Sequence, residues 1–130
     1  MTPLVIPFPP SVNRMYRVFR GRAIVSAIGR AYRAAVTESL AGTPKTTGRV
    51  SVAIVAHPPD NRRRDLDNLL KASLDGLVHG GALEDDSQID DLRIVRGENR
   101  RNGELTVLIH PIGVETAEQA LAAVGAMNAD

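Results

Sequence analysis

Leucines recur at helical spacing between residues 66 and 77, and this pattern constrains the fold more than any other feature of the chain. They fall at i, i+3, i+4, i+8 and i+11, which places them on one face of an α-helix: Leu66, Leu69, Leu70, Leu74 and Leu77. We therefore predict a helix from Asp65 to about Val78, ended by Gly80-Gly81, with its leucine face toward the core. Directly before it, the β-branched segment Val50–His57 predicts a strand.

The remaining elements mix strands and helices. Further strands are predicted at Leu4–Phe8, Met15–Phe19, Arg22–Val25, Ile89–Arg96 and Leu105–Ile109. We expect a turn at Arg20-Gly21 to join Met15–Phe19 and Arg22–Val25 into a hairpin. A turn at Asn102-Gly103 is expected to pair Ile89–Arg96 with Leu105–Ile109. Ser26 is the expected N-cap of a helix to about Leu40, and a closing helix is expected over Glu115–Met127. Because strict βαβ alternation is missing, we predict an α+β fold, with a mixed sheet packed with helices in a single compact domain, residues 1–130.

Composition excludes several classes of function. The chain has no cysteine, which rules out disulfides, thiolate metal sites and a cysteine nucleophile. It has neither a GxGxxG nor a GxxxxGK[ST] motif, so no nucleotide cofactor is expected. It has no run of about 18 apolar residues and no signal-peptide pattern at its start, so we expect a soluble, cytoplasmic protein with no membrane partner.

The net charge of +1 conceals a division along the chain. Residues 1–64 carry eleven Arg and Lys against two acidic residues, a net +9, whereas residues 65–130 carry five against thirteen, a net −8. Fourteen of the sixteen basic residues are arginine, whose planar fork pairs bidentately with phosphate. The division is consistent with a polyanion-binding half and an acidic half in one domain, or with two ordinary mixed surfaces that happen to segregate.

The two halves meet in a run of charged residues at the start of the leucine helix. If the leucines are buried, Asp67 and Lys71 share a neighbouring helix face, and Asp65 at the helix boundary can turn toward Asp67. One more carboxylate from the acidic loop Glu84–Asp86 would complete a hard-oxygen site suited to magnesium, waters and a substrate phosphate. Lys71 could stabilise charge on that phosphate, and Arg62–Arg64 could bind the adjoining backbone.

Each of these features also has a simpler interpretation. Asp65 can cap the helix, and Asp67 can favour its first turn through the helix dipole. Arg62–Arg64 can be a solvated run, Asp67 and Lys71 an i,i+4 surface pair, and Asp85-Asp86 a polar turn. The placement of three arginines directly against acidic residues weakens the separate interpretations taken together, and the chemistry of the residues leaves both the metal site and these simpler interpretations open.

The same segments resemble a known family. RRRDLDNLLKASLDGL, followed by EDDSQIDDLRI, is similar to the signature of RusA-type crossover-junction endodeoxyribonucleases. PFPPSVNRMYR, RGRAIVSAIGRAYR and HPPDNRRRD also resemble family segments in the same order. The resemblance covers about residues 4–109, and the expected C-terminal helical extension, residues 115–130, has no counterpart in it.

The resemblance implies a homodimeric, Mg²⁺-dependent resolvase that makes paired symmetric nicks in four-way DNA junctions, in DNA recombination and repair. It implies three metal carboxylates, Asp65, Asp67 and Asp86, which with Lys71 form the catalytic set, while Asp85 stays an alternative ligand. The residues expected to contact DNA are Arg62, Arg63, Arg64, Asn68 and Arg14. A nuclease for other branched DNA and a non-catalytic branched-DNA-binding protein are the alternatives. With only four aromatic residues, the sequence itself indicates no base-stacking platform or aromatic wedge.

Overall fold

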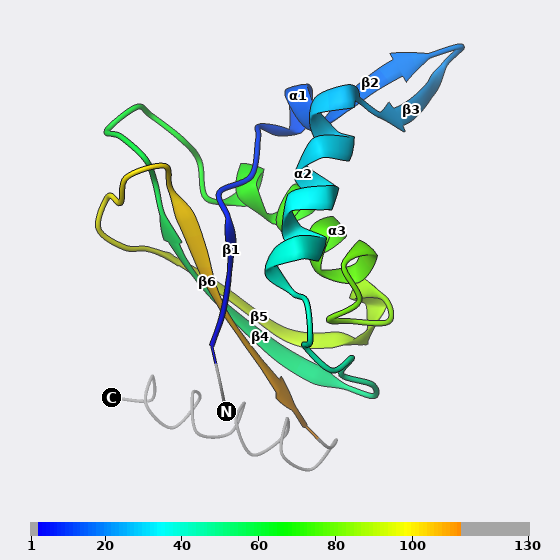
Figure 1. Ribbon diagram of the computed structural model, residues 1–130, viewed down its shortest axis with the longest axis vertical. Coiled ribbons are helices and arrows are strands. Elements are labelled where there is room, and N and C mark those ends of the chain that lie inside the picture. The colour runs from blue at the N-terminus through cyan, green and yellow to red at the C-terminus, as the bar shows by residue number, and fades with distance from the viewer. Residues whose placement is uncertain (1–2, 113–130) are drawn as a thin grey trace, which may run out of the picture.

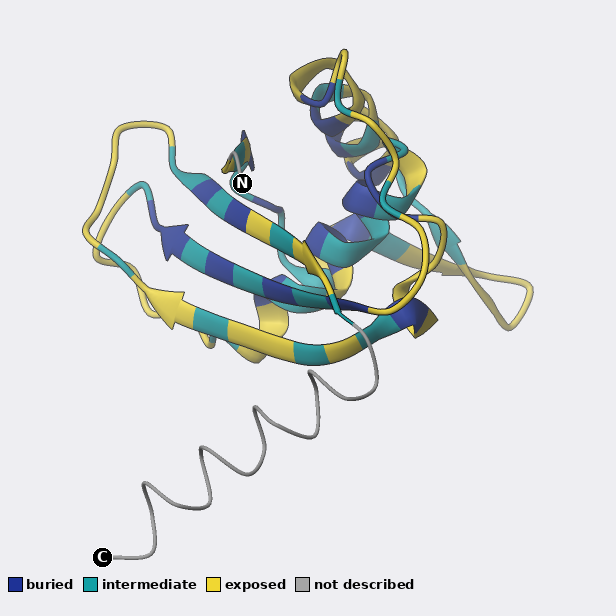
Figure 2. Cartoon of the chain, turned by 90° about the horizontal axis from the view of Figure 1, so that it is seen from below, coloured by how far each residue is buried: buried dark blue, intermediate teal, exposed yellow. Residues whose placement is uncertain are grey.

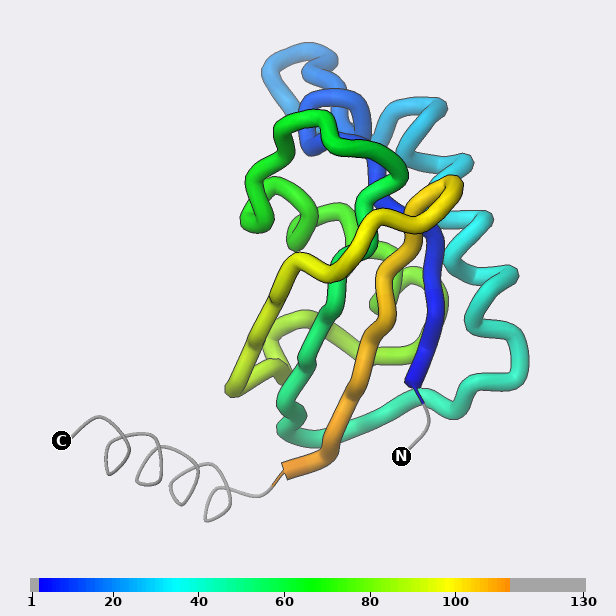
Figure 3. Tube along the Cα trace, turned by 90° about the vertical axis from the view of Figure 1, so that its left-hand side faces the viewer, coloured from blue at the N-terminus to red at the C-terminus, as the bar shows by residue number. Residues whose placement is uncertain are grey.

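A four-stranded mixed sheet forms the centre of the protein, for which a computed structural model describes residues 3–112. The order across the sheet is β1-β6-β4-β5, with β4 and β5 parallel and the other neighbours antiparallel. Figure 3 shows the four strands side by side in this order. Their bounds are β1 Leu4–Pro7, β4 Val50–His57, β5 Ile89–Arg96 and β6 Glu104–Pro111. The α+β fold with a mixed sheet is therefore confirmed.

Two helices, α2 (Ala27–Ser39) and α3 (Asp67–His79), cover one face of this sheet (Figure 1). A short helix α1 (Val12–Met15) precedes a separate hairpin of β2 (Tyr16–Phe19) and β3 (Arg22–Val25), and a 3₁₀ turn η1 (Asp86–Gln88) precedes β5. The hairpin projects away from the rest of the molecule (Figure 1). No helix within residues 3–112 is both long and apolar enough to cross a membrane.

The core lies between the sheet and the helices. Along β4, alternate residues are buried, as the period-2 pattern requires of a strand with one face on the core (Figure 2). From α3, Leu69 and Leu77 are buried, while Leu66, Leu70 and Leu74 are partly buried against the same cluster. The predicted leucine face is thus confirmed. The helix begins at Asp67, two residues later than expected.

Local signals located most of the other elements correctly. The hairpin turns at Arg20 and Gly21, whose φ values of 51° and 72° are those of a two-residue turn that matches the strand twist. The Ser26 hydroxyl caps α2 by accepting a hydrogen bond of 3.0 Å from the Gly29 N–H. The predicted helix at Glu115–Met127 lies outside the described residues.

The predicted pairing of the last two strands is wrong. Asn102 and Gly103 do form a turn, with φ of 68° and 67°, but β4 lies between β5 and β6 and pairs with both. The first cause is that β4 has the most regular buried face and so occupies an interior position of the sheet. The second is that α3 connects the end of β4 to the start of β5, which makes these two strands parallel neighbours. The loop from residue 97 to residue 103 then crosses the end of β4, where the Gly97 N–H donates to Ala56 O at 2.8 Å.

Candidate nucleic-acid interface and metal centre

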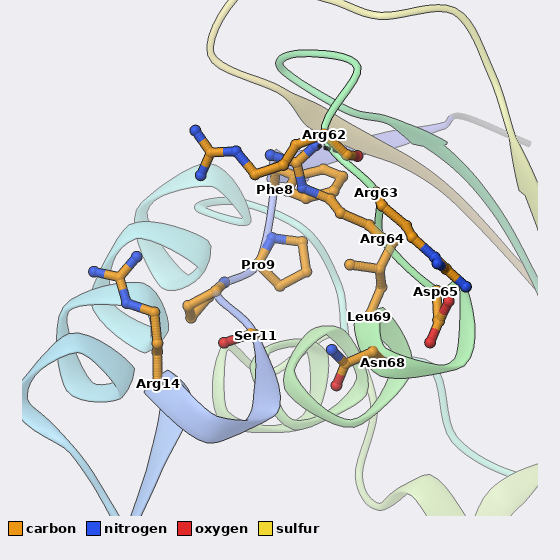
Figure 4. Close-up of a pocket in the computed structure, with 11 residues that line it drawn as sticks. Phe8, Pro9, Ser11, Arg14, Arg62, Arg63, Arg64, Asp65, Asn68 and Leu69 are labelled. Atoms are coloured by element: carbon orange, nitrogen blue, oxygen red, sulfur yellow. Dashed lines mark hydrogen bonds between the residues drawn. The ribbon is translucent and has the colours of Figure 1, made fainter.

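A pocket of about 480 Å³ opens near the ends of β1 and β4. Its walls come from residues 8–11, from Arg14 of α1, from the segment 62–65 and from Asn68 and Leu69 of α3 (Figure 4). All five residues expected to contact DNA therefore line one pocket, together with Asp65. Arg14 is separated from the arginine run by almost fifty residues of sequence, and only the fold brings it there.

Arg64 is held in place within this pocket. Its Nη1 donates to Asp60 Oδ1 at 2.8 Å, and its guanidinium lies over the Phe8 ring, 5.5 Å from the centroid. Arg96 of β5 donates to the Arg64 carbonyl at 2.7 Å. The Arg64 hydrogen bond, followed by one from the Arg62 N–H, lowers the pKa of Asp60. Arg64 is thus a fixed wall of the pocket.

The two neighbouring arginines are less constrained. The Arg62 side chain is 80% exposed and lies 3.8 Å from the Asp60 carboxylate, a distance too long for a hydrogen bond. Arg63 forms no ion pair with any residue between 3 and 112. These guanidinium groups can bind phosphate without first breaking a strong protein contact.

Asp65 and Asp67 are exposed carboxylates, and Asp65 lines the same pocket as these arginines. The N-cap of α3 is Leu66 and no side chain caps the helix, so Asp65 does not act as the cap. Neither aspartate forms an ion pair within the described part of the chain, although several other acidic residues do: Asp60, Asp75, Asp90, Asp91, Glu98 and Glu104. Carboxylates that form no ion pair among residues 3–112, with Asp65 in the same pocket as Arg62 and Arg63, suit a bound cation and a phosphate.

Lys71 lies one turn along α3 from Asp67 but does not pair with it. Its ammonium group is 4.7 Å from the centroid of the Tyr16 ring, beside a second pocket of about 430 Å³. Burial, followed by the charge of Asp75, raises the pKa of Tyr16, and Arg33 opposes this. The bidentate Arg33–Asp75 pair, with both contacts at 2.8 Å, ties α2 to this part of α3. Lys71 therefore projects from a well-anchored surface.

The acidic loop distinguishes Asp85 from Asp86. The Asp85 carboxylate accepts from the Ser87 N–H at 3.1 Å and from the Ser87 hydroxyl, and these bonds lower its pKa. Asp86 is exposed and has no ion-pair partner among residues 3–112. Since the carboxylate of Asp85 already has its partners in the loop, Asp86 is the better candidate ligand.

One subunit does not bring Asp86 to the other two carboxylates. Asp65 follows the carboxyl end of β4, whereas Asp86 comes just before the amino end of β5. In the parallel register Val50 lies opposite Ile89 and Ala56 opposite Arg96, so these positions are at opposite ends of strands roughly 25 Å long. Accordingly, residues 3–112 contain no group of three Asp, Glu or His side chains placed to hold a metal.

Three residues outside the predicted site support its arginines and Lys71. Sequence reasoning missed Phe8 and Asp60, whereas Tyr16 stands in a segment that resembles the family, where a core or turn role is equally expected. Phe8 underlies Arg64, Tyr16 underlies Lys71, and Asp60 restrains the arginine run. Of the two that were missed, only Asp60 left a signal in the sequence, because it stands four residues before Arg64. The two aromatic contacts join segments more than fifty residues apart.

An arginine-lined pocket that contains the carboxylate of Asp65, unpaired within residues 3–112, on one α+β domain, is the arrangement expected of a protein that binds nucleic-acid phosphates with the help of a cation. The family model described as "Endodeoxyribonuclease RusA" matches residues 7–110, so the chain belongs to the RusA family of endodeoxyribonucleases. The resemblance stated from the sequence is thereby confirmed, and membership of a nuclease family supports a need for a divalent metal.

Curated relatives agree with this assignment. The chain is 44% identical over 115 residues to the crossover junction endodeoxyribonuclease of Enterobacteria phage 82, covering 86% of this chain and 96% of the relative. The protein of the same name from Escherichia coli strain K12 is 43% identical over the same shares. That of Enterobacteria phage HK97 is 40% identical over 108 residues, which is 81% of this chain and 90% of the relative.

Proposed function

We propose that this protein is a magnesium-dependent endonuclease that resolves Holliday junctions by paired symmetric nicks, in DNA recombination and repair. The observation that carries the proposal is the position of Asp65, which lines one pocket together with Arg14 and Arg62–Arg64 and stands two residues before Asp67. Both aspartates are exposed, and neither forms an ion pair in the described chain. The names of the relatives, crossover junction endodeoxyribonucleases, support the choice of four-way DNA as the substrate.

The donor chemistry of these residues fits magnesium. Mg²⁺ is usually held by one or two carboxylates together with waters and substrate phosphate, and Asp65 and Asp67 offer two such groups. When bound there, the ion would supply a Lewis acid and an activated water for phosphodiester hydrolysis.

The chain's own residues would position the DNA. Arg62 and Arg63 bind phosphates beside the cut, while the restrained Arg64 and Asn68 fix the direction of the strand across the pocket. Lys71, held over Tyr16, places a positive charge on the same helix as Asp67 and can stabilise negative charge that develops on the phosphate.

A homodimer meets two requirements of this function. Paired nicks in a two-fold-symmetric junction need two sites related by the same symmetry. In addition, because Asp86 lies at the far end of its own subunit, we propose that Asp86 of the partner subunit joins Asp65 and Asp67. In an isologous dimer the two subunits make the same contact, so each subunit would supply its Asp86 to the site of the other.

Mixing two inactive variants tests this shared site. In a heterodimer of an Asp67→Asn subunit and an Asp86→Asn subunit, one shared site carries both substitutions and the other carries neither. We expect the mixture to regain nicking of one strand per junction, although each homodimer is inactive. If each site used Asp86 of its own subunit, both sites would be damaged and no activity would return. A monomeric mass in light scattering, with full resolving activity, would also exclude the dimer.

The proposed reaction itself is tested with labelled DNA. We expect symmetric nicks in a mobile four-way junction with Mg²⁺, none with EDTA, and far weaker cutting of a Y-fork or linear duplex. Equal cutting of the Y-fork would favour a nuclease for other branched DNA. Junction binding without cleavage in any divalent metal would favour a non-catalytic binding protein.

A further inference from the structure

The β2–β3 hairpin contributes no residue to the arginine pocket. Its two strands pair only with each other, and it extends from the body of the protein (Figure 1). Phe19, at the end of β2, is 50% exposed. A single exposed ring does not by itself require a partner, so the groups around Phe19 decide what it can bind.

The charge around this ring identifies the chemistry of the partner. The guanidinium carbons of Arg17 and Arg20 lie 5.6 Å and 5.3 Å from the ring centroid, and Arg22 sits opposite Phe19 in the strand register. None of the three arginines has an ion-pair partner within residues 3–112, and the segment 16–25 contains no acidic residue. A half-exposed apolar ring flanked by arginines without ion pairs in the described chain fits a polyanion with an apolar interior, and stacked DNA has both properties.

The hairpin is also held in a fixed direction relative to the pocket. At its base, the Ser26 hydroxyl donates to the carbonyl oxygens of Arg14 and Met15, at 2.5 Å and 3.0 Å. Arg14 lines the arginine pocket, and Tyr16 of β2 lies under Lys71. The base of the hairpin and one wall of the pocket therefore share Arg14.

We propose that Phe19 inserts between base pairs at the junction branch point, while Arg17, Arg20 and Arg22 bind the flanking phosphates. Apolar side chains that wedge between base steps unstack them, and arginines beside the wedge offset that cost through phosphate contacts. The branch point is the favourable place, because the base pairs there have less stacking to lose. This inference rests on the proposed junction substrate and adds how the protein distorts it.

Fluorescence of 2-aminopurine at the branch point of an immobile four-way junction tests the wedge. Unstacking raises its emission, and EDTA in the buffer prevents cleavage. We expect the wild-type protein to raise the signal several-fold and Phe19→Ala to abolish the rise, with about tenfold weaker junction binding. Phe19→Tyr, which retains a flat ring, should keep most of the signal. Val18→Ala is the matched control, since Val18 is 78% exposed and neighbouring strand residues point to opposite faces.

The outcomes separate this inference from the proposed function. If the wild type cuts junctions but Phe19→Ala gives the same fluorescence rise, the wedge is wrong and the nuclease stands. If Phe19→Ala instead converts a dimer into a monomer in light scattering, the hairpin is a subunit contact and the wedge is also wrong. If the wild type neither binds nor cuts junctions, both proposals fail. Circular dichroism of each variant confirms that the exposed substitutions leave the fold intact.

Discussion

Gln88 fastens the acidic loop to the body of the protein, and replacing it with methionine should separate the loop from its support. The side chain is 7% exposed and makes four hydrogen bonds. Its Oε1 accepts from the N–H groups of Glu84 and Asp85 at 2.8 Å and 3.1 Å, and its Nε2 donates to the carbonyls of Thr46 and Gly48 at 3.0 Å and 2.8 Å. Methionine has a similar length but can make none of these bonds.

The expected loss follows from those four bonds. A typical hydrogen bond contributes about 1 kcal/mol net, so four of them give a central figure of about 4 kcal/mol. Glu84 and Asp85 are exposed, so water can replace part of the two bonds from their N–H groups. We therefore expect Gln88→Met to lower the free energy of unfolding by about 2 to 3 kcal/mol, which for a domain of this size lowers Tm by roughly 10 °C.

Urea unfolding and thermal melts of the two proteins measure this difference. Ser87→Ala is the matched control, because it removes one exposed hydroxyl contact to Asp85 from the same loop and should cost less than about 1 kcal/mol. Cleavage by folded Gln88→Met, assayed below its melting range, should also fall because Asp86 loses its support. A stability change below about 0.5 kcal/mol would show that Gln88 does not hold the loop.

Two further predictions concern stability. Gly29→Ala should strongly destabilise the fold, because an added Cβ would stand 2.3 Å from Met15 O and 2.6 Å from Val25 Cγ1; a melt within 2 °C of wild type would contradict this close packing. Hydrogen bonds lower the pKa values of Asp60, Asp85 and Asp90. Their stabilising contribution is present above the ordinary carboxyl pKa near 3.9 and is lost as pH falls through the lowered values. Tm should stay constant between about pH 5 and 7 and should fall below about pH 4. A Tm that stays unchanged below about pH 4 would contradict the stabilising role of these hydrogen bonds.

The sequence predicted those elements whose signals are local. The leucine spacing of α3, the Ser26 cap and the Arg20-Gly21 turn each depend on a few neighbouring residues, and each is present in the structure. Strand pairing is not local in this sense. Because β5 and β6 follow one another in the sequence with a turn at Asn102-Gly103 between them, they were predicted to pair. In the structure β4, whose buried face is the most regular, lies between them.

The candidate site shows the same limit. Residue types and spacing drew attention to Arg62–Arg64, Asp65 and Asp67, and the fold gathers all but Asp67 around one pocket together with Arg14. Spacing could not reveal that Asp86 stands at the other end of the parallel strands, because that distance is set by the crossover from β4 to β5. Nor could it reveal that Phe19, unremarkable in the sequence, becomes the exposed tip of a projecting hairpin.

The most direct test of the account is Asp67→Asn, measured in a gel-shift titration and a cleavage time course on one four-way junction at matched salt. We predict a loss of nicking on the order of 100-fold or more, because a neutral amide cannot replace a metal carboxylate. Junction binding should stay equal or tighten slightly, since one charge that repels phosphate is removed. Glu38→Gln, an equal charge change at an exposed position of α2, should leave both unchanged. If Asp67 only favoured the first turn of the helix, the variant would lose about 0.3 to 1 kcal/mol of stability and keep its activity. Near-normal nicking by a folded Asp67→Asn protein would therefore contradict the proposed site.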